Sequence, residues 1–169
     1  MFEIGDYVVN AANGICRITE LVEMDLSGSQ DMKQYFLLIP VEEPTARVYI
    51  PLDTAESRIR KAITREEALA VIDRIPEIPE LVVRSEKERE LKYREAVKSC
   101  DPIQLAALLK MLYRRRQERM AAGKKNTAVD ERYFKMAESH LYSELAFVIG
   151  EDKSQMVTVI TNRIEHVNA

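Results

Sequence analysis

The sequence has no tryptophan, two cysteines, five glycines among 169 residues, and no long apolar run. A membrane-spanning helix needs roughly 18 apolar residues with few charges, and no stretch approaches that length. Met1-Phe2-Glu3 does not resemble the start of a signal peptide. Cys16 and Cys100 lie far apart and outside any metal-ligand spacing. These absences predict a soluble cytoplasmic protein, in a compartment where thiols stay reduced.

The signals of catalysis and cofactor binding are also missing. The chain has no glycine-rich phosphate loop, and neither cysteine has an identifiable base partner for nucleophilic chemistry. His140 and Glu144 are spaced like half a metal site, but no further ligand lies near them in sequence. We therefore interpret them as a surface ion pair on one helix face. The sequence predicts no enzyme, no cofactor and no metal.

Positive charge is concentrated in one segment of an acidic chain. The net charge is -3, yet residues 84–125 hold thirteen cations and six anions. Within them, "LYRRRQERMAAGKK" places six cations in fourteen residues. Residues 1–52 carry three cations and eight anions, and the remaining segments are acidic as well. Such a local positive field fits a polyanion, or alternatively a solvated helix face.

Up to about Leu52 the sequence predicts short β-strands. "DYVVN" and "GICRITELVEM" are rich in β-branched residues, and the Asn13-Gly14 pair between them favours a tight hairpin turn. "QYFLLIPV" has the length of a buried strand, and in "ARVYIPL" Arg47 and Tyr49 alternate with Val48 and Ile50. Four or five such strands indicate a small antiparallel sheet or barrel.

From Asp53 onward the pattern becomes helical. "TREEALAVIDRI" begins with a capping box, Pro76 and Pro79 end that helix, and three longer helices and a weaker one follow. The second long helix begins at Asp101-Pro102, and Gly150 ends the third. The predicted fold class is α+β, with a β domain over residues 1–57 and an all-helical domain over residues 58–169.

An ordered set of short segments resembles one family. "FEIGDYVVNAANGICRITELVE" carries an apolar residue, Gly5-Asp6, the Val8-Val9 strand and a turn that ends in Gly14. "VYIPLDTA", "RIRKAITREEA", "LYRRRQER" and "SELAF" follow in the order of the same pattern. Together they resemble the CarD/CdnL type of bacterial transcription regulators, whose amino-terminal module is shared with transcription-repair coupling factors.

This resemblance implies a Tudor-like amino-terminal barrel that binds the RNA polymerase β subunit. The implied helical domain contacts promoter DNA and stabilises the open complex, without a small-molecule substrate. Some family members use arginines against the polymerase where this chain has Met24 and Tyr49, with Arg47 beside Tyr49. We therefore expect Met24, Arg47 and Tyr49 to bind the polymerase.

The basic segment would supply weak, salt-sensitive contacts to the DNA backbone. The cations expected to make them are Arg84, Lys87, Arg89, Lys92, Arg114, Arg115, Arg119, Lys124 and Lys125. In the alternative interpretation, Arg116 and Arg119 border the core, pair with acids, and the other cations cap a helix. Many family members also place a tryptophan early in the first long helix, and this chain has none. That difference favours the second hypothesis, a protein–protein adaptor without DNA contact.

Overall fold

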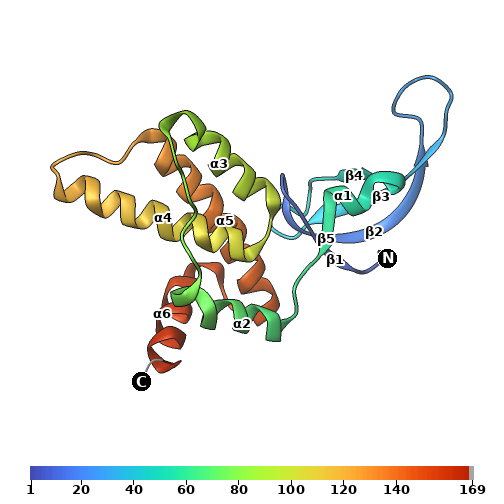
Figure 1. Ribbon diagram of the computed structural model, residues 1–169. Coiled ribbons are helices and arrows are strands. Elements are labelled where there is room, and N and C mark those ends of the chain that lie inside the picture. The colour runs from blue at the N-terminus through green and yellow to red at the C-terminus, as the bar shows by residue number, and fades with distance from the viewer. Residues whose placement is uncertain (168–169) are drawn as a thin grey trace. The chain divides into compact units, whose positions relative to one another are not determined.

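The chain divides into two compact units, one from Met1 to Ala62 and the other from Ile63 onward. The computed structural model describes residues 1–167 (Figure 1). The division falls later than the boundary predicted after residue 57, because residues 59–61 pair in the sheet of the first unit. The predicted α+β class is confirmed, since an antiparallel sheet precedes a set of helices.

The first unit contains five antiparallel strands in the order β4-β3-β2-β1-β5. Their bounds are β1 Tyr7–Asn10, β2 Gly14–Met24, β3 Lys33–Pro40, β4 Val48–Pro51 and β5 Ile59–Lys61. β4 and β5 stand at the two ends of this order. Closure of the series into a Tudor-like barrel stays a prediction.

The turn between β1 and β2 follows the prediction. Asn10 pairs with Gly14, and Gly14 takes a positive φ of 70°, which side chains with a Cβ disfavour. The Asn10 side chain accepts a hydrogen bond from the Ala12 backbone N–H at 2.9 Å. Asp25 organises the β2–β3 loop similarly, by accepting from the backbone of Ser27, Gly28 and Gln30.

One prediction for the first unit is wrong. After the short helices η1 (Leu52–Thr54) and α1 (Ala55–Arg58), the chain returns to the sheet as β5 instead of continuing in helices. β5 pairs with β1, and Ile59 packs with Val8 and Ile18 in the core. Three residues are too few for a strand pattern to stand out, so only the pairing with distant residues reveals β5.

The second unit is helical throughout. Its elements are α2 (Arg65–Arg74), η2 (Ile75–Glu77), α3 (Glu86–Ser99), α4 (Pro102–Ala121), α5 (Ala128–Ile149), η3 (Lys153–Gln155) and α6 (Met156–Val167). Thr64 and Glu67 form the predicted capping box of α2, and Asp101 caps α4 by accepting from the Ile103 backbone N–H. Gly150 ends α5 in the left-handed region, as predicted.

The core of the second unit lies among α3, α4 and α5, which pack against one another. Leu105, Leu108 and Leu112 form the buried stripe of α4, while Leu109 is partly buried. Met156 and Ile160 of α6 join this core. Among the described residues, no helix is both long and apolar enough to cross a membrane.

Glu144 corrects another prediction. The sequence suggested that it forms an ion pair with His140 at the surface. The surface position is wrong, because Glu144 is buried in α5, whereas the pairing with His140 stays a prediction. Its carboxylate accepts a hydrogen bond from the backbone N–H of Ile63 at 3.0 Å. The residue thus anchors the first residue of the helical unit to α5, a contact that spans too much sequence for a local pattern to indicate.

Lys110 of α4 holds the segment that follows α2. Its ammonium donates to the carbonyl oxygens of Ile75, Pro76 and Ile78 at 2.9, 3.2 and 2.6 Å. These carbonyls surround the proline-containing turn, where helical hydrogen bonds end. One side chain therefore satisfies three acceptors and ties the turn to α4.

We predict that Lys110→Met lowers the free energy of unfolding by about 2 kcal/mol, because charged donors stabilise such acceptors and their loss leaves carbonyls unpaired. Urea unfolding followed by circular dichroism measures the change. Lys98→Met, at an exposed position of α3, is the matched control and should change stability by less than about 0.5 kcal/mol. Equal effects of the two substitutions would contradict the assigned role.

Candidate functional site: two interaction surfaces

The register of the sheet places Met24 and Tyr49 on the same face. Tyr49 pairs with Leu37, and Leu37 pairs with Glu20. Met24 lies four residues beyond Glu20 on β2 and so shares its side of the strand. We call this face the outer face; its residues are Glu20, Val22, Met24, Lys33, Tyr35, Leu37, Tyr49 and Pro51. The core side chains Ile18, Phe36 and Ile50 point to the other side.

Arg47 stands at the border of the outer face. It precedes β4 by one residue and Tyr49 by two, so it continues the same alternation. Its side chain is exposed, while Tyr49 and Met24 are partly exposed over the buried Tyr35 and Leu37. The structure therefore brings the three predicted polymerase-binding residues to one sheet face, with Met24 at the far end from Arg47.

Sequence analysis missed Tyr35 and Leu37, which lie between Met24 and Tyr49 on β3. In "QYFLLIPV" nearly every residue is apolar, so alternation could not separate the core face from the outer face. β4 also ends the strand order, and within residues 1–167 its second edge pairs with no strand. Such an edge offers backbone groups to a partner strand.

Many of the predicted DNA-binding cations are already paired with acids. Arg89 donates to Glu86 at 2.7 and 2.9 Å and to the Tyr93 hydroxyl at 3.0 Å. The hydrogen bonds that Arg89 donates to Glu86 are the main reason that the pKa of Arg89 lies above its usual range, and the same bonds lower the pKa of Glu86. Arg89 therefore links the Glu86 carboxylate to the Tyr93 hydroxyl on α3, and its positive charge is largely neutralised by Glu86.

Arg114 is committed in a similar way. It contacts Glu80 at 2.6 Å and Glu118 at 2.8 Å, so α4 is linked to the segment before α3. Lys92 lies 3.8 Å from Glu95 on the exposed side of α3. Exposed pairs of this kind contribute little to stability, but each carboxylate neutralises a charge that DNA would otherwise meet.

Asp130 of α5 is the buried centre of the charged network. Its side chain is 1% exposed and accepts from Arg115 Nε at 2.6 Å and from the Tyr93 hydroxyl at 2.9 Å. Arg115 comes from α4 and Tyr93 from α3, so one carboxylate joins three helices. Burial raises the pKa of Tyr93, which keeps its hydroxyl available as a donor. Arg115 thus has a structural partner that the sequence did not indicate.

The last arginines of α4 border the core, as the alternative interpretation expected. Arg119 donates to the backbone carbonyl of Lys125 at 2.9 Å, which holds the loop between α4 and α5. The Arg116 guanidinium lies over the Phe134 ring, 5.6 Å from its centroid. Neither makes an ion pair with an acid in the described part of the chain, so the partners differ from those predicted.

Four predicted DNA-binding residues keep their charge available. The side chains of Arg84, Lys87, Lys124 and Lys125 are exposed, and none forms an ion pair among residues 1–167. Arg84 lies just before α3 and Lys87 in its first turn, whereas the other two follow α4. These side chains could contact the phosphate groups of a polyanion without first breaking a salt bridge.

Two observations concern nucleophilic and metal-binding side chains. Burial raises the pKa of the Cys16 thiol to about 11, so the thiolate that would act as a nucleophile is disfavoured. Within the described residues, no group of three potential metal-ligating side chains comes together.

We predict that Asp130→Asn lowers the free energy of unfolding by about 2 kcal/mol, because Arg115 loses its buried countercharge. Chemical denaturation measures the loss. Glu131→Gln, the neighbouring exposed carboxylate that pairs with Lys135 at 3.5 Å, is the control and should cost less than about 0.5 kcal/mol. A variant as stable as the unsubstituted protein would show that the Asp130 network contributes nothing.

Comparison with known proteins identifies the first unit. Residues 2–63 match the family model of the CarD-like/TRCF RID domain, which covers the whole sheet. No curated protein matches the chain. The assignment suggested by the amino-terminal segments is therefore confirmed for this domain, while the likeness of "LYRRRQER" and "SELAF" in the helical unit stays a prediction.

Proposed function

Because residues 2–63 form a CarD-like/TRCF RID domain, we propose that this protein is a transcription regulator that binds the RNA polymerase β subunit. Its outer face, with Met24, Arg47 and Tyr49, makes that contact. The helical unit contacts promoter DNA and stabilises the open promoter complex. The family match is the observation that carries the proposal, and the shared sheet face of the three residues supports it.

The outer face suits a protein partner on physical grounds. It combines a partly exposed tyrosine, an arginine and buried apolar neighbours, and tyrosine and arginine often dominate the binding energy of interfaces. The adjacent edge of β4 adds backbone donors and acceptors. A contact of this kind is compatible with the acidic character of the unit, whose residues 1–62 carry six cations and ten anions.

The DNA contact is proposed to be weak and non-specific. It involves Arg84, Lys87, Lys124 and Lys125 directly, whereas Arg89, Lys92, Arg114, Arg115 and Arg119 contribute mainly to the field around them. Attachment to the polymerase raises the local concentration of these cations near promoter DNA, so that neither contact has to be strong. Cytoplasmic location follows from this proposal.

A second candidate function is a protein–protein adaptor that binds polymerase or another partner without DNA. The pairing of Arg89, Arg114 and Arg115 with carboxylates favours it, because these cations then stabilise the helical unit. The two hypotheses share the polymerase contact and differ in the role of the unpaired lysines. Charge reversal at those lysines separates them.

We predict that Arg47→Glu/Tyr49→Ala weakens capture of the purified polymerase β-subunit lobe by about thirtyfold, the effect of losing one or two interface anchors. Surface plasmon resonance with the immobilised lobe measures it. Arg65→Glu/Tyr113→Ala makes the same chemical changes at exposed positions of α2 and α4 and should leave the affinity within about twofold. Failure of the unsubstituted protein to bind would refute the polymerase role.

We predict that Lys124→Glu/Lys125→Glu weakens binding to a promoter duplex and reduces the dependence of log K on log salt by about two units, since each phosphate contact contributes about 0.9. Fluorescence anisotropy over a salt series measures both quantities. Arg65→Glu/Lys135→Glu, which changes the net charge equally at other exposed sites, should alter the slope little. If both pairs act alike while lobe binding is intact, the adaptor hypothesis is favoured.

A further inference from the structure

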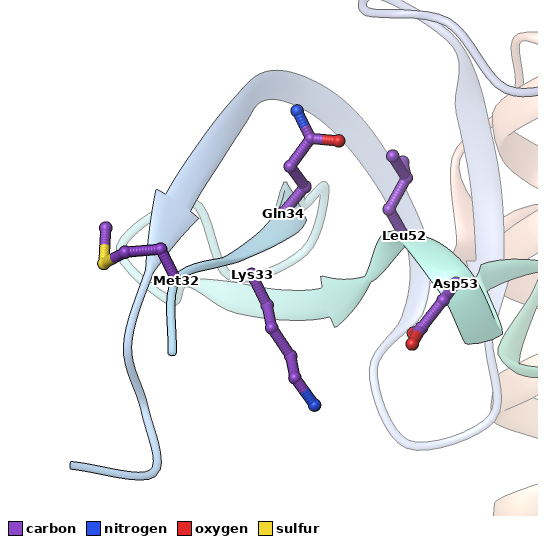
Figure 2. A pocket seen from close by; sticks show the side chains of 5 residues that line it. All are labelled: Met32, Lys33, Gln34, Leu52 and Asp53. Atoms are coloured by element: carbon purple, nitrogen blue, oxygen red, sulfur yellow. The ribbon is translucent and has the colours of Figure 1, made fainter. Parts of the chain in front are cut away.

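Two pockets of the first unit adjoin at Leu52, and neither is lined by Met24, Arg47 or Tyr49. One has a volume of about 480 Å³ and is lined by Met32, Lys33, Gln34, Leu52 and Asp53 (Figure 2). The other, of about 400 Å³, includes Phe2, Leu21, Phe36, Leu52 and Glu56 in its lining. We call the two pockets together the Leu52 groove.

The groove exists because β2 and β3 extend beyond the part of the sheet that pairs with β1. β1 pairs with β2 only from Gly14 to Arg17, so the rest of β2 pairs with β3 alone. Leu21 lies opposite Phe36 on the core-facing side, yet it is 45% exposed. Leu52, at the start of η1, is 36% exposed beside it. Apolar side chains that would normally complete a core therefore face solvent.

The groove and the outer face meet at Lys33, which lines the groove and pairs with Met24 in the sheet. Side chains alternate along a strand, so Leu21 and Phe36 point away from the side occupied by Met24 and Tyr49. A partner beside Leu21 and Leu52 would leave Arg47 and Tyr49 open. The two pockets together also have the size at which short peptide side chains are enclosed, since ligand pockets measure about 300–1,000 Å³.

Charge around the groove favours a basic occupant. Asp53 and Glu56 are exposed lining residues, and Glu23 pairs with Gln34 and therefore lies on the same side of the sheet. Lys33 is the one lysine or arginine among the residues that line these pockets, which also include Met1 with its amino group. In Figure 2, Lys33 and Asp53 extend to one side of the ribbon and Gln34 and Leu52 to the other. A polyanion such as DNA would be repelled by the surplus of carboxylates.

We propose that the Leu52 groove is a second docking surface, and that its occupant is a short peptide segment of a protein partner that combines an apolar side chain with neighbouring lysine or arginine. The apolar side chain inserts beside Leu21 and Leu52, and the cations pair with Asp53 and Glu56. The protein then connects two proteins, one at the Leu52 groove and the other at the Arg47 and Tyr49 end of the outer face.

The test titrates the full chain with a fluorescein-labelled peptide of leucine, lysine, glycine and serine. A matched peptide carries glutamate at every lysine position. Fluorescence polarisation should show saturable binding of the lysine peptide only. Asp53→Lys/Glu56→Lys should weaken it by at least about tenfold, because both substitutions replace attraction with repulsion. Both side chains are exposed, so the substitutions leave the core intact.

The matched control is Glu42→Lys/Glu43→Lys, which changes the net charge equally at exposed positions beyond the opposite end of β3. It should change the peptide affinity by less than about twofold. Equal losses in the two variants would mean diffuse attraction to an acidic domain and would overturn the proposal. Absence of binding by the unsubstituted chain, or equal binding of the glutamate peptide, would overturn it as well.

Two further measurements complete the test. Leu21→Ser/Leu52→Ser should also weaken peptide binding, and a thermal melt shows whether this variant is folded; if it is not, the charge variants decide. Asp53→Lys/Glu56→Lys should still bind the immobilised β-subunit lobe as tightly as the unsubstituted protein. Loss of lobe binding in that variant would make the groove part of the polymerase face and would overturn a separate docking surface.

Discussion

The arrangement of the helical unit depends on one buried carboxylate. Asp130 is almost fully enclosed, and a charge in that position is tolerated only when donors surround it. Arg115 and Tyr93 supply those donors from two other helices, and Arg89 in turn donates a hydrogen bond to the Tyr93 hydroxyl. Arg115 and Arg89 therefore form hydrogen bonds within the helical unit, although their sequence positions suggested a nucleic-acid surface. Some cations of the basic segment thus stabilise the packing of the helices, and the others are exposed to solvent.

The division of charge between the units has a physical consequence for binding. The sheet unit is acidic and presents aromatic, arginine and apolar side chains, which suits protein partners. The helical unit retains unpaired lysines at the start of α3 and after α4, which suits phosphate. When two weak binding surfaces belong to one chain, binding at the first raises the effective concentration of the second near its partner, so that neither contact has to be strong. The RID domain in the first unit is consistent with that division of labour.

Local patterns predicted much of the fold. The caps at Thr64 and Asp101, the turn at Gly14 and the end of α5 at Gly150 follow from rules that operate within a few residues, and the structure contains them. β5 was missed because three residues carry no period, and its partner strand lies some fifty residues earlier. Glu144 was placed at the surface because its spacing from His140 is local, whereas its backbone partner is Ile63.

The amino-acid sequence by itself determined the α+β class, the concentration of positive charge in residues 84–125 and the family of the first unit, because composition, periodicity and ordered motifs are properties of the chain alone. Only the tertiary structure decided which cations are available. Whether Arg115 faces DNA or Asp130, and whether Leu21 faces core or solvent, depends on residues brought together by folding. Ion pairing and burial are set by those distant neighbours, so no local pattern encodes them.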